Sequence, residues 1–335
     1  MYRISMRALV TTQDPAAKIS SRVEEVDEQR LPDGDVLVAI DWSSLNYKDA
    51  LCLNGLGNLV KTYPHVGGID FAGRVVESRD ARYHPGQAVI LTGWRVGEIH
   101  WGGYAQRARV NADWLVPLPK KLSTRDAMVL GTAGLTAMLA INRLKGVGIS
   151  PDMGPVLVTG AAGGVGSLSV MLLSRLGYKV SAATGRPEIG ERLKRLGAEE
   201  IISREDLALS PKVLGKERWA AAIDSVGGPI LASVLKQLKY GGAVASIGAA
   251  ADPAFPGSVI PFILRATSIV GIDSVMAPFE ARQAAWDRVR DLFSAAAYDG
   301  FVTEARLGDV PGHAAAMLKG GVAGRVVVNP RDASD

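Results

Sequence analysis

The sequence predicts an α/β fold in which a β-rich, barrel-like domain precedes a doubly wound parallel sheet. Residues 6–130 contain short apolar runs bounded by Gly, Pro and Asp, strands and helices alternate after Pro155, and a glycine-rich turn opens that second region. Closely spaced strands favour a partly open barrel, whereas alternating strands and helices are typical of a parallel sheet. A chain of 335 residues is long enough for two such domains.

The first domain is expected over 1–128, where the β pattern ends. A helix over Ala127–Leu144 follows, and its few charges predict that it is largely buried. The candidate strands of this domain are Arg7–Thr11, Val36–Asp41, Gly73–Val76, Gln87–Leu91 and Tyr104–Val110.

The second domain is expected over 129–272, with six short apolar strands joined by crossover helices. Residues 273–335 are expected to return to the first domain and make it discontinuous. The six strands are Val156–Thr159, Val180–Thr184, Glu200–Ser203, Ala220–Asp224, Ala243–Ile247 and Ser268–Gly271, and their helices are Val165–Leu176, Glu188–Leu196, Pro229–Leu238 and Ile260–Arg265. The tail is predicted to form helices over Glu280–Ala297 and Gly312–Lys319 and strands over Val302–Leu307 and Arg325–Val328.

The charge balance and the cysteine content restrict which partners the protein can bind and in which compartment it works. Lys and Arg number 38 against 34 Asp and Glu, a net charge of +4, and the charges are interspersed, which argues against nucleic-acid binding. The single cysteine, Cys52, excludes a disulfide framework and a Cys-rich zinc site within one chain, and fits a reducing, cytoplasmic location. No signal-peptide core follows Met1, and Met6 could equally be the start.

One uncharged stretch, Met153–Ser174, is long enough to cross a membrane. It is interrupted by Gly160, Gly163, Gly164 and Gly166, so a strand, a turn and a helix are expected there instead, and no membrane partner is predicted. The turn is Gly160–Gly166, a dinucleotide fingerprint with Ala161 where its first Gly usually stands. Gly163 would let the backbone approach a pyrophosphate, and Gly166 would let the helix pack closely on the strand. The alternative is a glycine-rich turn without a ligand.

The end of the next strand indicates NADP rather than NAD. NAD-binding domains carry an acid there for the ribose 2′-hydroxyl, but this chain has Thr184, Gly185 and Arg186. Arg186 could pair with a 2′-phosphate, Thr184 could donate a hydroxyl, and Arg204 could add charge. Glu188 directly follows Pro187 and is better explained as a helix-start residue. The alternative for both arginines is a solvated surface position.

Catalytic candidates are few. The four histidines, at positions 65, 84, 100 and 313, have no metal-ligand spacing, and no nucleophile elbow is present. The loop after Val36–Asp41 offers Asn46, whose amide could polarise a carbonyl, and Tyr47, whose phenol could donate a proton. Tyr47 could also be a simple packing residue. The aromatic residues Trp94, Trp101 and Tyr104 could wall a cleft or belong to the barrel core.

Over nearly its whole length the chain resembles the zinc-independent quinone oxidoreductase group of the medium-chain dehydrogenases/reductases, and within it the acrylyl-CoA reductase branch. Segments 131–138 and 159–166 mark the superfamily only, whereas Asn46–Asp49, 92–103 and Asp273–Met276 are specific to the branch. One departure is Gly67, where related sequences often carry Pro, and it should alter loop stiffness more than chemistry.

The resemblance implies a GroES-like barrel plus a Rossmann domain, with NADPH in the cleft between them and no metal. The cofactor contacts that it implies are Tyr47, Thr132, Ala162, Gly163, Gly164, Val165, Thr184, Gly185, Arg186, Arg204, Ile247, Gly248, Ala249, Ser274 and Arg325.

The expected activity is reduction of acryloyl-CoA to propanoyl-CoA, with hydride delivered to the β-carbon and a proton to the α-carbon from Tyr47 or water. Donors must stabilise the charge that develops on the thioester oxygen. Quinones or other α,β-unsaturated carbonyls are alternative substrates. A non-catalytic NADPH-binding protein with a structural or RNA-binding role is the alternative from another class.

A homodimer is expected through the edge of the parallel sheet. Ala266–Ile272 contains the sixth strand and lacks the Lys or Pro that usually protects an exposed edge. Pairing with a second copy would satisfy its backbone groups symmetrically. The alternative is that the chain's own 274–300 segment covers this edge.

Overall fold

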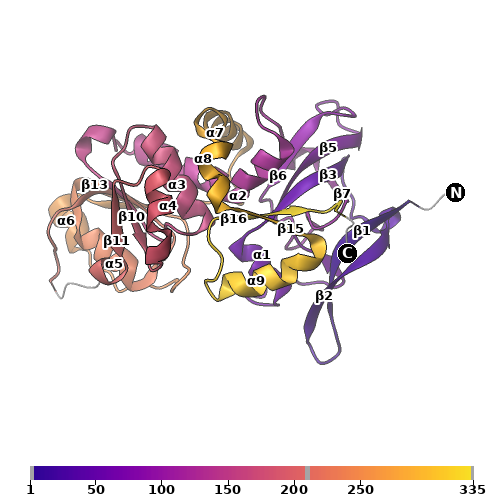
Figure 1. The fold of residues 1–335 in the computed structure, drawn as a ribbon, viewed down its shortest axis with the longest axis horizontal. Helices are drawn as coiled ribbons and strands as arrows, with labels where there is room; N and C mark the ends of the chain where they lie inside the picture. Colours follow the sequence, from indigo (N-terminus) through magenta and orange to yellow (C-terminus); the bar gives the residue numbers. More distant parts are fainter. Residues whose placement is uncertain (1–3, 208–211, 333–335) are drawn as a thin grey trace. The chain divides into compact units, whose positions relative to one another are not determined.

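The computed structural model describes residues 4–207 and 212–332. The chain divides into two compact units. Figure 1 labels the helices and strands and colours them along the sequence. Unit 1 contains Met1–Thr132, Val275–Gln283 and Phe301–Asp335, and unit 2 contains Ala133–Ser274 and Ala284–Gly300. The expected returning segment 273–335 is therefore shared between the two units.

Unit 1 is built from two β-sheets. The smaller sheet has the strand order β2-β1-β4, and the larger has the order β15-β16-β3-β5-β6-β8, with β7 also pairing with β3. Pairing is antiparallel except between β15 and β16. The strands are β1 (Ser5–Gln13), β2 (Ile19–Asp27), β3 (Val36–Leu45), β4 (His65–Val66), β5 (Asp70–Ser78), β6 (Ala88–Thr92), β7 (Arg107–Val110), β8 (Leu115–Pro117), β15 (Val302–Arg306) and β16 (Arg325–Asn329).

Two clusters of buried residues form the core of unit 1. One cluster lies among β3, β5, β6 and β7, where Ile40 and Phe71 are fully buried. The other joins β1 and β16 to the short helices α1 (Tyr47–Leu53) and α9 (Val310–Leu318). The helix and strands expected near the C-terminus, observed as α9, β15 and β16, therefore contribute to the core of unit 1. Helix α1 packs against the same cluster of buried residues.

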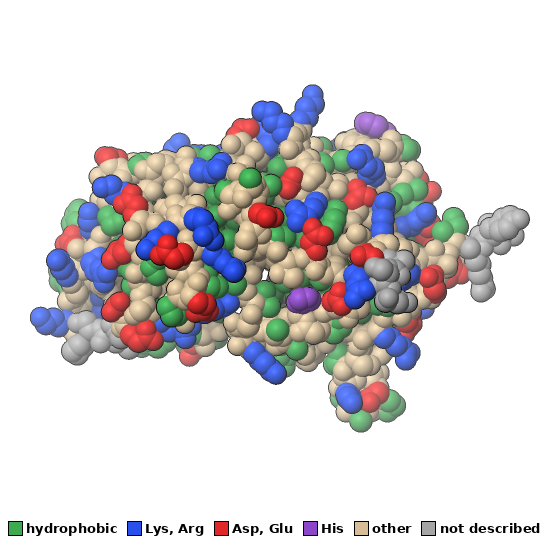
Figure 2. All heavy atoms as spheres, viewed as in Figure 1, with side chains coloured by type: hydrophobic (Ala, Val, Ile, Leu, Met, Phe, Trp, Pro, Cys, Tyr) green, Lys and Arg blue, Asp and Glu red, His purple; other side chains and the backbone are tan. Residues whose placement is uncertain are grey.

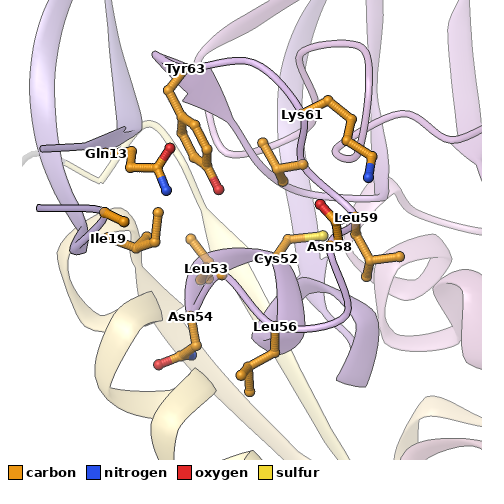
Figure 3. Close-up of a pocket in the computed structure, with 13 residues that line it drawn as sticks. Gln13, Ile19, Cys52, Leu53, Asn54, Leu56, Asn58, Leu59, Lys61 and Tyr63 are labelled. Carbon is orange, nitrogen blue, oxygen red and sulfur yellow. The ribbon is translucent and has the colours of Figure 1, made fainter. Parts of the chain in front are cut away.

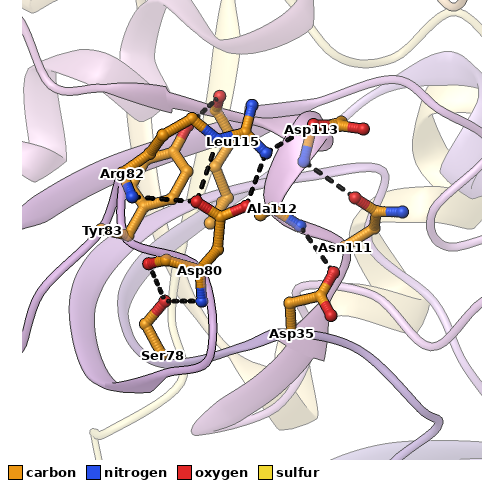
Figure 4. Close-up of polar contacts among 9 residues, drawn as sticks. All are labelled: Asp35, Ser78, Asp80, Arg82, Tyr83, Asn111, Ala112, Asp113 and Leu115. Atoms are coloured by element: carbon orange, nitrogen blue, oxygen red, sulfur yellow. Dashed lines mark hydrogen bonds and ion pairs between the residues drawn. The ribbon is translucent and has the colours of Figure 1, made fainter.

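A polar cluster ties the connection between β5 and β6 to the segment before β8 (Figure 4). Arg82 donates to Asp80 and to Asp113, and the hydroxyl of the neighbouring Tyr83 donates to the carbonyl of Leu115 at 2.6 Å. Because Arg82 and Asp113 are exposed, the ion pairs add little stability. The buried tyrosine hydrogen bond is the stronger link.

Unit 2 contains a six-stranded sheet with the order β11-β10-β9-β12-β13-β14, and all its pairs are parallel. This is the doubly wound strand order. The first strand, β9, is central; the next two strands are added on one side of it and the last three on the other. The fold class and all six strands expected from the sequence are confirmed, although β13 begins earlier than expected. The strands are β9 (Val156–Val158), β10 (Val180–Thr184), β11 (Glu200–Ser203), β12 (Trp219–Asp224), β13 (Leu238–Ser246) and β14 (Ser268–Gly271).

The helices that join the strands of unit 2 follow the expected alternation; α6 has the expected bounds and the other three have shifted ends. They are α3 (Gly164–Arg175), α4 (Gly190–Arg195), α5 (Gly228–Lys236) and α6 (Ile260–Arg265). The helix expected over Glu280–Ala297 is two helices, α7 (Phe279–Leu292) and α8 (Ala295–Tyr298). Ser294 interrupts it because this residue is extended and its side chain accepts the amide hydrogen of Ala297, starting α8 anew.

The buried helix α2 (Thr124–Gly146) is kinked at Gly131, which has φ 49° and ψ −151°. Within the described residues it is the one helix long and apolar enough to span a membrane, and most of its apolar window is buried, as in a core helix. Met153–Ser174 contains β9, a turn and all of α3 except its last residue, which fits the expected strand, turn and helix. In the view of Figure 2, acidic and basic side chains are mixed over the face shown.

Candidate functional site

The glycine-rich turn lies between β9 and α3. Gly163 is the residue before the first turn of α3, and no side chain caps that helix start. A helix start without such a cap offers N–H groups to an anion, helped by the helix dipole. A Cβ at Gly163 would meet only the carbonyl oxygen of Gly160, at 3.4 Å. The backbone here is open to a phosphate.

Two other glycines of this turn are required by packing. A Cβ at Gly166 would collide with the carbonyl oxygen of Gly160, and Gly160 itself has φ +60°. Ala161, which replaces the usual first glycine, is fully buried, and its N–H donates to the carbonyl of Ala183 at 3.0 Å. An alanine is accommodated there because its methyl group packs inside the unit.

The ends of β9 and β12 are tied together beside this turn. The hydroxyl of Thr159 donates to Asp224 at 2.6 Å, and the N–H of Gly227 donates to the same carboxylate at 2.9 Å. Asp224 is fully buried, and burial raises the pKa of its carboxyl group. Sequence reasoning missed Thr159 and Asp224. Their hydrogen bonds hold the loop after β12 beside β9, where the order of strands in the sheet switches from one side to the other.

Two arginines flank the glycine that follows β10. The N–H of Arg186 donates to the Thr184 hydroxyl at 3.0 Å, which fixes the turn. A Cβ at Gly185 would lie 2.7 Å from the nearest guanidinium nitrogen of Arg204. Gly185 therefore allows the Arg204 side chain to lie against the backbone. Arg204 is exposed and Arg186 is half-buried, so this corner presents positive charge.

The remaining predicted contacts of unit 2 lie after β13 and β14. The N–H of Ile247 donates to the carbonyl of Asp224, and Gly248 packs against the backbone of Ser225. Ala249 is exposed, and Ser274 is the last residue of the first stretch of unit 2. Unit 2 thus carries all the predicted cofactor contacts except Tyr47, Thr132 and Arg325.

Tyr47 begins α1, and its ring is 46% exposed. The phenol has no hydrogen-bond partner among residues 4–207 and 212–332. The residue before it, Asn46, starts the helix, and its N–H donates to Asp49 at 2.8 Å. Asp49 also accepts from the N–H of Ile69 at 2.8 Å and is completely buried. Burial, with the nearby Asp70 charge second, raises the pKa of Asp49 to about 7.

Asn46 and Arg325 are engaged inside unit 1. The Asn46 amide nitrogen donates to Asp70 at 3.0 Å, and its oxygen accepts from Arg325 at 2.9 Å. The Arg325 side chain also donates to Ser44 at 2.6 Å and to the carbonyl of Val129 at 3.0 Å. Asn46 is 8% exposed and Arg325 3%. Both side chains are therefore held inside unit 1, and the expected roles, carbonyl polarisation by Asn46 and cofactor contact by Arg325, stay predictions.

The third predicted contact on unit 1, Thr132, shares a partner with Asn46. Its N–H donates to Asp70 at 2.8 Å, immediately after the kink at Gly131. Asp70 is fully buried. Sequence reasoning did not identify Asp70 or Ser44 as site residues.

The three aromatic residues expected near a cleft lie in different surroundings. Tyr104 is completely buried in the core, and Trp101 packs against the same cluster. Trp94 packs on the other cluster of unit 1, and the guanidinium of buried Arg282 lies 4.7 Å from its ring centre. Tyr104 is thus a core residue and not a cleft wall.

A pocket of ≈ 430 Å³ lies at the C-terminal end of α1 (Figure 3). Its lining includes Cys52, Asn58 and Tyr63, and none of the predicted site residues. Burial raises the pKa of Cys52 to about 12, so its thiol is protonated and unreactive at neutral pH. The pocket is separate from the proposed chemistry.

The residues described contain no group of three or more His, Cys, Asp or Glu side chains that could hold a metal ion. His65 is buried and His100 is half-buried, and burial lowers the pKa of each. His100 contacts the carbonyl of Arg109 at 2.8 Å. Among residues 4–207 and 212–332, the histidines and carboxylates do not gather into a set of zinc ligands.

Known families match both units. Residues 32–120 match the alcohol dehydrogenase GroES-like domain, and residues 164–293 match the zinc-binding dehydrogenase family. The lack of a set of zinc ligands among the described residues departs from the name of the second family.

Individual relatives are similar over nearly the whole chain. Acrylyl-CoA reductase AcuI of Ruegeria pomeroyi is 51% identical, over 96% of this chain and 98% of its own length. The YhdH oxidoreductase of Salmonella enterica, solved in complex with NADP, has a TM-score of 0.95 and 49% identity, over 97% of this chain and 100% of that one. Bacillus subtilis YhfP, solved with NAD, has a TM-score of 0.93 and 44% identity, over 97% and 99% of the two chains. The chain belongs to the medium-chain dehydrogenase/reductase family of oxidoreductases, in the group that contains AcuI and YhfP.

Proposed function

We propose that the protein is an NADPH-dependent reductase of activated C=C bonds and that it converts acryloyl-CoA to propanoyl-CoA. The observation that carries the cofactor choice is the corner after β10, where Arg186 and Arg204 flank Gly185 and no acid ends the strand. The similarity to AcuI over 96% of the chain supports the substrate.

The corner after β10 suits a 2′-phosphate better than a free ribose hydroxyl. Two guanidinium groups offer charge-assisted hydrogen bonds to a phosphate, and a carboxylate at the strand end would repel one. The uncapped start of α3 offers N–H groups for the pyrophosphate. Because a relative has been solved with NAD, the test must compare both cofactors.

The reduced nicotinamide supplies the hydride when the cofactor is bound. The chain itself must then provide a proton or orient a water molecule, and it must stabilise the thioester oxygen. Tyr47 is suited to the proton step because its phenol is exposed and has no partner in the part of the chain that the structure describes. Water remains the alternative donor. Asn46, which directly precedes Tyr47 and accepts from Arg325, supports the backbone that carries the phenol.

The experiment that tests this function follows the absorbance of NADPH with acryloyl-CoA as substrate. We expect steady oxidation of NADPH, slower oxidation of NADH, and formation of propanoyl-CoA. Faster turnover with a quinone or a simple enone would assign the enzyme to those substrates instead. Tight NADPH binding without turnover of any of them would identify a non-catalytic binding protein.

The reaction is proposed to need no metal ion. The described histidines and carboxylates do not gather into a ligand set, and the proposed steps use only a phenol or water and a bound cofactor. Dialysis against a strong chelator should leave the rate unchanged. Activity that disappears on dialysis and returns with zinc would contradict this proposal. With Cys52 as a buried free thiol, a reducing, cytoplasmic location is proposed as well.

The active form is proposed to be a homodimer joined at β14. Among the residues that the structure describes, this strand pairs only with β13 and ends the sheet. The alternative is that segment 274–300 covers this edge. Three hydrogen bonds join the second half of that segment to helices outside the sheet, which favours a free edge: Arg288 donates to Asn142, Arg175 donates to the carbonyl of Leu292, and Arg192 donates to the carbonyl of Gly300. Beside the edge, α6 and the residue before it expose Val259, Ile263 and Leu264, at 66%, 69% and 59%. A second copy would pair the edge and cover these side chains.

A further inference from the structure

Four buried side chains of unit 1 form a closed ring of hydrogen bonds. Arg325 donates to the Ser44 hydroxyl at 2.6 Å, and Ser44 donates to Asp70 at 2.7 Å. On the other side, Arg325 donates to the Asn46 oxygen at 2.9 Å, and the Asn46 nitrogen donates to Asp70 at 3.0 Å. The Arg325 guanidinium and the Asp70 carboxylate are thus joined by two bridges, one through Ser44 and one through Asn46. In both bridges the hydrogen bonds are donated from the Arg325 side towards Asp70.

This arrangement explains how the charges are tolerated inside the unit. Arg325 is 3% exposed and Asp70 is 0% exposed. A buried charge is costly unless it is paired and fully hydrogen-bonded. Each bridging group accepts from the cation and donates to the anion, so each bond polarises the next one. We refer to Arg325, Ser44, Asp70 and Asn46 as the buried ring.

The buried ring, which contains one predicted contact of unit 1, Arg325, holds the backbone beside the other two, Tyr47 and Thr132. Asn46 immediately precedes Tyr47 and starts α1. On the other side, Asp70 accepts the N–H of Thr132 at 2.8 Å. A Cβ at Gly131 would lie 2.6 Å from an Asp70 oxygen and 2.9 Å from Ser44 and Arg325 atoms, so the kink of α2 rests directly on the ring. One cluster therefore determines the position of both residues.

We propose that Asp70 and Arg325 are positioning residues, which act through Ser44 and Asn46 to hold Tyr47 and Thr132 in the geometry of the reaction. The inference rests on the proposed function of Tyr47. Because the phenol has no partner among the described residues, its direction depends on the backbone that carries it. A small displacement of a reacting group can cost about 100-fold in rate without unfolding the protein.

The experiment compares two neighbouring serines on β3. Ser44→Ala opens one side of the ring. Ser43→Ala is the matched control, because Ser43 is equally buried and its hydroxyl donates to the backbone carbonyl of Asp70 at 2.7 Å, outside the ring. Each variant loses one buried hydroxyl and should lower Tm by a similar amount. We expect kcat with acryloyl-CoA to fall by about 10- to 100-fold for Ser44→Ala and by less than about 3-fold for Ser43→Ala.

A double-mutant cycle with Tyr47→Phe separates positioning from general damage. If Ser44 acts through Tyr47, Ser44→Ala should cost much less in the Tyr47→Phe protein than in the wild type. Independent, multiplying losses would overturn the inference, as would an equal loss of kcat in Ser43→Ala. If Tyr47→Phe alone leaves kcat unchanged, the proposed role of Tyr47 fails first and the inference falls with it. These outcomes are distinguishable in one set of four proteins plus the control.

Arg325→Lys provides a second test. It keeps the charge, but a single ammonium group cannot replace the planar fork that reaches both Ser44 and Asn46. We expect a folded protein with kcat lowered and the KM for acryloyl-CoA nearly unchanged. A Lys variant with wild-type kcat would show that charge alone matters and would overturn the proposed geometry.

Discussion

The corner of unit 2 that is proposed to bind the cofactor and the Tyr47 region of unit 1 are built in opposite ways. The first consists of backbone, glycines and two arginines at or near the surface, within short stretches of sequence. The second rests on buried charged and polar side chains from β3, β5 and β16 and the start of α1. A phosphate can be recognised by local backbone N–H groups, whereas a single phenol needs support from distant parts of the fold.

Tyr47→Phe should give the largest effect and tests the catalytic side of this contrast. It keeps the ring and removes one hydroxyl, so kcat should fall about 10- to 1000-fold if the phenol donates a proton or orients the carbonyl. Turnover of acryloyl-CoA measures it. Tyr240→Phe is the control, since it removes an exposed phenol hydroxyl from unit 2.

Two further results would revise the role of Tyr47. Phe behaving like Tyr while Ala is poor would show that only the ring matters. Wild-type rates for both variants would move the catalytic site away from this loop.

Arg186→Ala tests the cofactor corner and should act on binding. Loss of a charge-assisted pair with the 2′-phosphate should weaken NADPH binding about 10- to 100-fold. NADH binding should change little, because NADH lacks that phosphate. Dissociation constants for both cofactors measure the effect, with Arg195→Ala as an exposed-arginine control in α4. Equal weakening for both cofactors, or none, would contradict the assignment.

Ile269→Lys tests the proposed dimer, which depends on the edge of unit 2. A charge brought by each partner to the pairing strand should weaken association by about 10-fold or more. Sedimentation at several protein concentrations measures it. Val147→Lys adds the same charge at a position after α2 and should leave association unchanged. A wild-type protein that sediments only as a monomer at micromolar concentration would rule out the dimer.

Asp49→Asn should give the smallest effect, a change in how stability varies with pH. The pKa of Asp49 is raised from 3.8 to about 7, so the folded protein keeps a proton there that the unfolded chain loses. The proton on folded Asp49 adds most to the free energy of unfolding below pH about 4, and this contribution is lost as the pH rises through about 7. In the Asn variant this loss should be absent, so its Tm should fall less than that of the wild type between these pH values. Parallel Tm profiles would contradict it.

The sequence predictions succeeded where a feature depends on residues that are close in the chain, and failed where it depends on distant ones. The turn Gly160–Gly166 and the six strands of unit 2 were correctly placed, because each follows from a local pattern of glycines or apolar residues. The break in the helix over Glu280–Ala297 was missed, since an extended Ser294 depends on its surroundings. Asp70 and Ser44 were not identified as site residues, because an isolated Asp or Ser carries no signal of burial.

What the sequence alone determined is the fold class, the order of the strands along the chain and the position of the dinucleotide turn. These depend on residues that are neighbours in the chain, whose spacing sets hydrogen bonding and burial locally. The tertiary structure decided which polar residues lie together inside unit 1. Arg325 and Ser44 are 281 residues apart in sequence, yet their side chains are 2.6 Å apart. Only folding brings such residues together. Because burying a charge costs free energy unless the charge is paired and hydrogen-bonded, each of these side chains needs the others.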